Sequence, residues 1–244
     1  MSSFNQKFNA ALKANSLPDS LLLAENDSSF ESLVRLLAEK NRVMNLTAIT
    51  EEDEIIVKHL IDSLTAAPCL PTGASVLDVG SGAGFPSLPL ALARPDLRIT
   101  ALDATEKKIR YIQETAKALQ ISSLDTLSAR AEAAARLKNL RGSFDCVISR
   151  AVASLPVLLE LCIPFLKEGG TLIAMKGAKA DQEMDASAHA MEVLGCKMAE
   201  TKHFQLVSPF DNSYEERCLI VIRCLRPAPP EYPRDFAAIK KKPL

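Results

Sequence analysis

From residue 75 onward, short apolar runs alternate along the chain with segments of helical periodicity. The apolar runs have the length and the bounding turns of buried parallel strands, and they lie at 75–79, 97–102, 124–128, 145–149 and 171–175. Two longer runs, at about 197–207 and 217–225, flank a turn-rich connector and predict a closing antiparallel hairpin. This order predicts an α/β fold whose seven-stranded, mostly parallel sheet carries helices on both faces. The helices are expected at about 86–93, 105–119, after 132, 155–165 and 180–194.

The first part of the chain, by contrast, has helical periodicity without strands. Ser28–Glu31 fits a capping box, and the apolar side chains that follow it repeat at helical spacing. A second helix is expected from Thr50 to about Leu64, and the segment 41–49 between them is too irregular for helix or strand. We therefore divide the chain into a helical extension, an α/β domain and a tail, at residues 1–68, 69–226 and 227–244.

One polar cluster lies on the expected helix after Thr50. His59, Asp62 and Ser63 are spaced i, i+3 and i+4, so they share the side opposite the apolar one. We interpret them as a solvated polar face, because charged side chains usually face water. A role in a site is the alternative.

A glycine-rich turn follows the first strand, within Val76–Pro86. Gly80, Gly82 and Gly84 permit close backbone approach to a ligand, and Pro86 is suited to the first turn of a helix. Phe85 occupies the last position of a dinucleotide fingerprint, and no Gly-Lys-Ser/Thr completes a phosphate loop. Tight packing of strand on helix, without any ligand, is the alternative.

The pattern Asp78-x-Gly80-x-Gly82-x-Gly84 resembles the first motif of the class I S-adenosylmethionine-dependent methyltransferases, which have a Rossmann-like fold. That cofactor has no pyrophosphate and needs a carboxylate near its ammonium group rather than a cationic cradle. Asp103 ends the second strand, where a carboxylate can accept both ribose hydroxyls; an acid that stabilises a helix N-terminus is the alternative. Ala131 and Glu132 follow the third strand, within reach of an adenine edge.

Five separated motifs add a closer resemblance, and they are Asn45–Ile49, Lys58–Leu64, Asp78–Pro86, Ile148–Leu155 and the ending Lys241–Leu244. Together they resemble the RsmG family, also called glucose-inhibited division protein B, of bacterial 16S rRNA guanine-N7 methyltransferases. The resemblance implies methyl transfer from S-adenosylmethionine to N7 of guanine 527 in the decoding-region loop. It also implies a helical extension before the methyltransferase domain, and cofactor contacts at Gly80, Phe85, Ala131, Glu132 and Arg150. The family often has Gly at Ser87, usually has Phe at Val152, and often has a longer Lys/Pro-rich run at 236–239.

The residues after the fourth strand are consistent with N7 chemistry. Guanine N7 has a free lone pair and no proton, so its attack on a sulfonium methyl needs alignment rather than a general base. The sequence Ser149-Arg-Ala-Val-Ala lacks the motif of exocyclic adenine methylation, and Cys146 lies in mid-strand without the proline that precedes a C5 nucleophile. We therefore assign the catalytic role to Arg150, whose guanidinium can donate to phosphate or to guanine. A structural ion pair with Asp103 or Glu132 is the alternative.

Composition restricts the other possibilities. The chain has 244 residues and a formal charge of -1, so any RNA contact has to be local. Its six cysteines form no Cys-x-x-Cys pair and predict reduced thiols and no metal site. No apolar run reaches about 18 residues, and no signal peptide precedes the domain, so we expect a cytoplasmic protein with no membrane contact.

The tail supplies the positive charge that RNA binding needs. Residues 223–244 carry cations in excess of Glu231 and Asp235, and their prolines predict an extended chain. The cations are Arg223, Arg226, Arg234, Lys240, Lys241 and Lys242, and Lys176 and Lys179 could join them. The expected partner is 16S rRNA or the assembling small subunit, bound by a monomer. A small-molecule or protein acceptor, a non-catalytic binding module and a frayed tail without function are the alternatives, whereas Phe85 argues against an NAD dehydrogenase.

Overall fold

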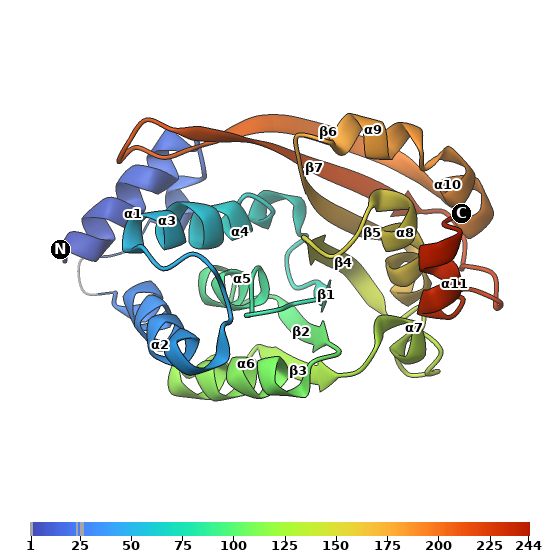
Figure 1. The fold of residues 1–244 in the computed structure, drawn as a ribbon, viewed down its shortest axis with the longest axis horizontal. Coiled ribbons are helices and arrows are strands. Elements are labelled where there is room, and N and C mark those ends of the chain that lie inside the picture. Colours follow the sequence, from blue (N-terminus) through green and yellow to red (C-terminus); the bar gives the residue numbers. More distant parts are fainter. Residues whose placement is uncertain (1, 23, 25–26) are drawn as a thin grey trace.

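The computed structural model describes residues 2–22, 24 and 27–244, and over these residues the chain forms a seven-stranded sheet. The strand order is β3-β2-β1-β4-β5-β7-β6 (Figure 1). The strands are β1 (Ser75–Val79), β2 (Arg98–Asp103), β3 (Leu124–Ser128), β4 (Phe144–Arg150), β5 (Leu166–Gly177), β6 (Cys196–Val207) and β7 (Tyr214–Cys224). Strands β1 to β5 pair in parallel, and β7 runs antiparallel to both β5 and β6. The predicted fold class, including the closing hairpin, is confirmed.

Helices cover both faces of this sheet, which explains why the central strands are apolar on both sides. The helices of the α/β region are α5 (Ser87–Ala93), α6 (Glu106–Ala118), α7 (Ala131–Ala134), α8 (Leu155–Cys162), α9 (Ala180–Asp185), α10 (Ala188–Leu194) and α11 (Phe236–Lys241), with 3-10 turns at Ala67–Cys69 and Ile163–Phe165. Helices α5 and α6 share one core with the N-terminal helices, and α8, α10 and α11 share the other (Figure 1). In β1, Val76 and Leu77 are fully buried on opposite faces.

Three local predictions in this region need correction. The helix expected at 180–194 is interrupted, because the Ser187 hydroxyl donates to the carbonyl of Glu183 and the chain turns between α9 and α10. Pro86 is the N-cap of α5 rather than a residue of its first turn. Strand β5 begins at Leu166, ahead of the glycine pair that was expected to precede it.

The N-terminal region consists of α1 (Ser3–Ala14), a 3-10 turn (Asp19–Leu21) and α2 (Ser29–Met44), whose aromatic side chains pack together. The predicted capping box is wrong, because Ser28 makes no side-chain cap bond. Instead, the Asp27 carboxylate accepts from the backbone N–H of Ser29 at 2.9 Å and from its hydroxyl at 2.6 Å. Helix α2 also runs into the segment expected to be irregular and ends at Asn45, which is left-handed with φ 50°.

The expected helix after Thr50 forms as three joined pieces, α3 (Glu52–Ile55), a π-helical segment (Ile56–Ile61) and α4 (Asp62–Leu64). The prediction that its polar residues form a solvated face is wrong. Asp62 is 4% exposed and Ser63 is fully buried, because strands β4 and β7 lie against this side of the helix. Buried polar groups require partners, and the Ser63 hydroxyl donates to the carbonyl of His59.

The tail is not extended throughout. Residues 236–241 form α11, whose Ile239 is fully buried in the core beside α8. Two arginines from the segment after α7 hold the preceding loop by its backbone: Arg136 donates to the carbonyl of Pro233, and Arg141 donates to those of Ala228, Pro229 and Tyr232. None of the helices in residues 2–22, 24 and 27–244 has the length and hydrophobicity of a membrane span.

We expect Arg234→Ala to lower the free energy of unfolding by about 3–5 kcal/mol, because it leaves a buried carboxylate without its cation. The guanidinium of Arg234 pairs with Glu160 at 2.6 Å, and the Glu160 side chain is fully buried in α8. Urea denaturation measures the loss, and Lys241→Ala in the same segment is the control because Lys241 is exposed. Equal, small losses in both variants would contradict this role of the pair.

Candidate functional site

The turn after β1 is built by its backbone. The N–H groups of Gly80 and Ser81 both donate to the carbonyl of Leu102 in β2, at 2.8 and 3.0 Å. Gly80 has φ +77° and Gly82 has φ +57°, a left-handed conformation that favours glycine. Because β2 and β4 both pair in parallel with β1, all three strands end at the same edge of the sheet.

Asp103 extends this turn from the end of β2. One carboxylate oxygen accepts from the N–H of Gly82 at 3.0 Å, and the other accepts from the N–H of Thr105, at the start of α6, at 2.8 Å. Asp103 therefore lies at the N-terminus of α6, where the alternative interpretation also placed it, and it bonds to the N-cap residue Thr105. A carboxylate has about four lone-pair positions, so both oxygens keep capacity for ligand hydroxyls.

Two cavities meet at the turn. One, the groove, has a volume of about 350 Å³ and is lined by residues that include Gly80, Gly82, Phe85, Asp103 and Arg150. The other, of about 170 Å³, lies beside the groove and is lined by residues that include Gly80, Asp103, Ala131, Glu132 and Val152. The structure thus brings together most of the residues expected to contact a cofactor.

Two of the expected residues lie outside these cavity walls. Gly84 packs against α5, where an added Cβ would lie 2.4 Å from Leu88. Asp78 is fully buried beneath the turn and accepts from the Ser87 hydroxyl, and its Oδ1 has no partner among the described residues. Burial raises the pKa of Asp78 to about 7, although the Ser87 hydrogen bond and the charge of Arg150 favour the ionised form.

Arg150, at the end of β4, points into the groove and is held by the N-terminal extension. Its Nη1 lies 2.8 Å from Asp62 Oδ2 and 3.0 Å from the carbonyl of Lys58, and its guanidinium lies 5.8 Å from the centre of the Phe85 ring. The expected alternative, an ion pair with Asp103 or Glu132, is wrong in its partner, because the carboxylate is that of Asp62.

His59 is a site residue that sequence reasoning placed in solvent. Its ring stacks on Phe85 at 4.7 Å, and its Nε2 lies 2.8 Å from the Thr47 hydroxyl. Burial, aided by the charge of Arg150, lowers the pKa of His59 to about 4, so the imidazole is neutral at pH 7. The available signal was the i, i+3, i+4 spacing of His59, Asp62 and Ser63, without an indication of what faces them.

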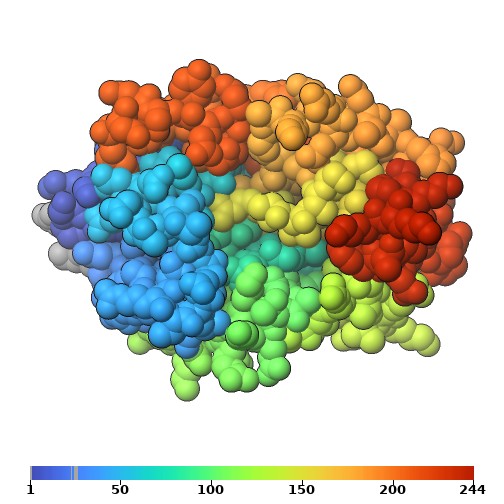
Figure 2. All heavy atoms as spheres, viewed as in Figure 1, coloured from blue at the N-terminus to red at the C-terminus, as the bar shows by residue number. Residues whose placement is uncertain are grey.

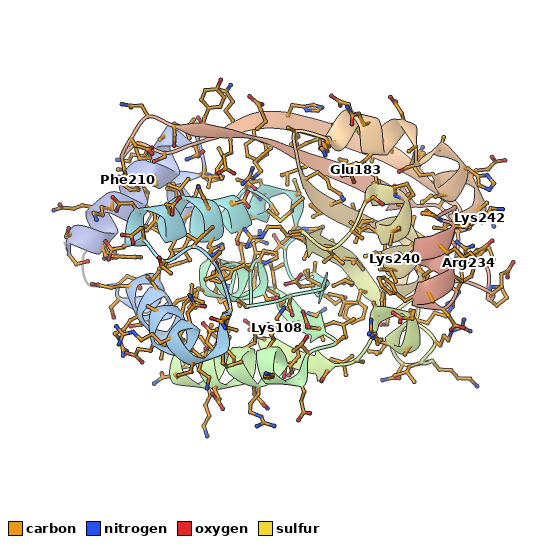
Figure 3. The ribbon with its side chains drawn as sticks, in the orientation of Figure 1. Lys108, Glu183, Phe210, Arg234, Lys240 and Lys242 are labelled. Carbon is orange, nitrogen blue, oxygen red and sulfur yellow. The ribbon has the colours of Figure 1, made fainter. Side chains whose placement is uncertain are left out.

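A third and larger cavity, of about 680 Å³, adjoins the groove and shares His59, Arg150, Ala151 and Val152 with it. Charged side chains line this cavity, and they are Lys58, Asp62, Arg150, Lys176, Glu183, Glu215 and Arg217. Figure 3 shows Glu183 on the α9 side of the strand ends and Lys108, which lines the groove, on the α6 side. In the part of the chain that is described, no group of three or more His, Cys, Asp or Glu side chains could hold a metal.

Replacing Asp78 should change how stability depends on pH. The raised pKa means that folded Asp78 keeps a proton that the unfolded chain releases above its usual pKa of 3.8. This group therefore stabilises the fold fully at low pH, and the contribution falls as pH rises through about 7. We expect the melting temperature of the native chain, minus that of Asp78→Asn, to fall between about pH 4 and 7 and to level off at higher pH. A difference in melting temperature that stays constant over this pH range would contradict this role of Asp78.

Solved structures support the fold. The chain is similar to M. jannaschii TYW2, solved in complex with AdoMet, with a TM-score of 0.53 and 17% identity over 67% of this chain and 74% of that one. It is also similar to the YcgJ protein of Bacillus subtilis, with a TM-score of 0.51 and 14% identity over 69% of this chain and 99% of that one. At these identities the likeness concerns the fold alone.

Sequence relatives are much closer. The ribosomal RNA small subunit methyltransferase G of Bacillus cytotoxicus is 43% identical over 217 residues, which cover 88% of this chain and 89% of that protein. The protein of the same name from Bacillus cereus is 40% identical over 98% of both chains. Residues 26–209 match the GidB family model, described as rRNA small subunit methyltransferase G. The predicted cofactor, S-adenosylmethionine, is the one on which this family depends. The chain therefore belongs to the GidB family of rRNA small subunit methyltransferases.

Proposed function

We propose that the chain transfers the methyl group of S-adenosylmethionine to N7 of a guanine in 16S rRNA, guanine 527 in the family. The observation that carries this proposal is the meeting of two cavities at Arg150 in a chain of this family. The groove lies at the glycine turn, where class I methyltransferases hold their cofactor, and the larger cavity opens beside it. A methyl group could therefore be transferred directly from a cofactor in the groove to an acceptor in the larger cavity.

The residues around the groove fit this cofactor. The backbone of Gly80 and Gly82 and the ring of Phe85 would hold the methionyl part, and the free lone pairs of Asp103 would accept the ribose hydroxyls. Ala131 and Glu132, in the adjoining cavity, would face the adenine. Asp78, buried beneath the turn, would act indirectly: it would hold the backbone of the turn in place through the hydrogen bond that it accepts from the Ser87 hydroxyl. When bound, the cofactor supplies an electrophilic methyl group on a sulfonium centre.

The acceptor base would enter the larger cavity. Guanine N7 attacks with its own lone pair, so the protein has to orient the base and exclude water rather than remove a proton. The side chain of Arg150 is 15% exposed, and among its guanidinium nitrogens only Nη1 forms hydrogen bonds with described residues. Its other N–H groups can donate to guanine O6 and hold the base in line with the methyl group. Neutral His59 provides an uncharged wall between the two cavities.

The RNA itself is expected to contact exposed cations around this edge. Lys240, Lys241 and Lys242 are exposed on α11 and at its end, and Figure 3 shows Lys240 and Lys242 beside Arg234 at the C-terminal end of the molecule. In Figure 2 this C-terminal segment, in red, lies across the central strands from the N-terminal segment, in blue. Phe236, the first residue of α11, lines the cavity that holds Ala131 and Glu132, so RNA bound by α11 would lie beside the cavities. We propose that a monomer binds the RNA in this way, in the cytoplasm, where ribosomal subunits assemble.

Methylation of ribosomal RNA tests the function directly. Small subunits and naked 16S rRNA from cells that lack the protein should accept tritium from labelled S-adenosylmethionine, and mapping should place the label on N7 of one guanine. Arg150→Lys keeps the charge beside Asp62 but loses the planar fork, so we expect methylation at least tenfold slower with a small change in melting temperature. Label on another base, on protein or on neither RNA substrate would contradict the proposal, and an unchanged rate in Arg150→Lys would remove the fork from the mechanism.

Neutralising the lysines of α11 should reduce the salt dependence of RNA binding. Each phosphate contact contributes about 0.7–0.9 to the slope of log affinity against log salt, so Lys240, Lys241 and Lys242 changed together to Gln should lower the slope by about 2–3. Filter binding at several salt concentrations measures the slope. The same change at Lys13, Lys117 and Lys197, exposed lysines of other elements, is the control. Equal slopes for the two triple variants would show that α11 has another task.

A further inference from the structure

A buried carboxylate from the N-terminal extension lies between two guanidinium groups. Asp62 Oδ2 is 2.8 Å from Arg150 Nη1, and Asp62 Oδ1 is 3.1 Å from Arg217 Nε. Its side chain is 6% exposed, whereas those of the two arginines are 15% and 20% exposed. One carboxylate thus joins α4, β4 and β7 at the place where the groove and the larger cavity meet.

The charges at this junction balance only when Asp62 is included. The cations are Lys58, Arg150 and Arg217, and the carboxylates that pair with them are Glu54, Asp62 and Glu215. Glu215 is 44% exposed and pairs with Lys58 and Arg217, so Asp62 is the carboxylate that pairs with Arg150 among the described residues. Without it, Arg150 would present an uncompensated charge to both cavities.

An uncompensated cation there conflicts with the chemistry of the methyl donor. The sulfur of S-adenosylmethionine is a cationic sulfonium, and it becomes a neutral thioether when the methyl group leaves. The C–S electron pair stays on sulfur, the N7 lone pair forms the new N–C bond, and the positive charge passes to the base. If the groove holds the cofactor and the larger cavity holds the acceptor, the sulfur would lie near the junction that Arg150 lines.

We propose that Asp62 is a positioning and charge-balancing residue that neutralises Arg150 and so favours the cationic methyl donor over its neutral by-product. This inference rests on the cofactor of the proposed function and not on the identity of the acceptor base. When a unit charge of the protein lies a few ångströms from a ligand charge in a half-buried site, deleting the protein charge changes the affinity for the ligand by about tenfold or more. The effect falls on S-adenosylmethionine alone, because S-adenosylhomocysteine has no charge on sulfur.

Calorimetric titration of the full chain with each of the two ligands tests the proposal. Asp62→Asn keeps the shape of the side chain and should raise the ratio of the S-adenosylmethionine Kd to the S-adenosylhomocysteine Kd about tenfold. Glu160→Gln is the matched control, because it breaks another buried carboxylate–arginine pair away from the cavities. It should lower the melting temperature and leave the ratio unchanged. If Asp62→Asn weakened both ligands by the same factor, Asp62 would be only structural and the proposal would be overturned.

Two further variants keep the test decisive if Asp62→Asn folds poorly. Arg217→Gln leaves Asp62 to Arg150 alone and should lower the ratio, a change opposite in sign to that of Asp62→Asn. In the double variant Asp62→Asn with Arg150→Gln both charges are absent, and the ratio should return toward that of the native chain. A ratio that is unmoved in Arg217→Gln, or still raised in the double variant, would contradict charge balancing. Absence of S-adenosylmethionine binding to the native chain would instead overturn the cofactor, whereas methylation of a different base would leave the role of Asp62 intact.

Discussion

The parallel pairing of β1 with β2 and β4 is the constraint on which the rest of the site depends. It places the ends of three strands at one edge of the sheet, where the carbonyl of Leu102 accepts from two N–H groups of the glycine turn. Asp103 then continues from β2 and holds the turn by Gly82, and Arg150 continues from β4 into the same groove. Both side chains reach the groove because β2 and β4 lie on either side of β1.

The N-terminal extension completes this edge. Its π-helical segment places His59 against Phe85 in the turn after β1, and α4 places Asp62 against Arg150 at the end of β4. Side chains of the extension therefore contact the residues at the edge of the sheet. The site is therefore complete only where the extension packs on the sheet. Arg150 and its counter-charge Asp62 come from different parts of the chain, so under the proposed role of Asp62 the affinity for the cofactor would depend on the packing of α4 on the sheet.

Local pattern predicted the elements that depend on local physics. Strand β1 is apolar because both of its faces are buried, and the glycine turn is visible because positive φ favours glycine. Partners distant in the sequence were not predictable in this way. Asp62 is 88 residues from Arg150 and 155 from Arg217, so its spacing on the helix indicated a polar side but not what lies against it. The helix in the tail was not predictable for the same reason, because α11 is stabilised by the burial of Ile239 in the core beside α8, which is distant in the sequence.

The claim that the glycine turn holds an adenosyl sulfonium is tested most directly by titration calorimetry of the native chain with S-adenosylmethionine, NAD and ATP. We expect saturable heat at one site per chain with S-adenosylmethionine, abolished by prior saturation with S-adenosylhomocysteine, and no comparable heat with NAD or ATP. The absence of heat with S-adenosylmethionine, together with clear binding of NAD or ATP, would contradict the assignment of the groove and the mechanism built on it.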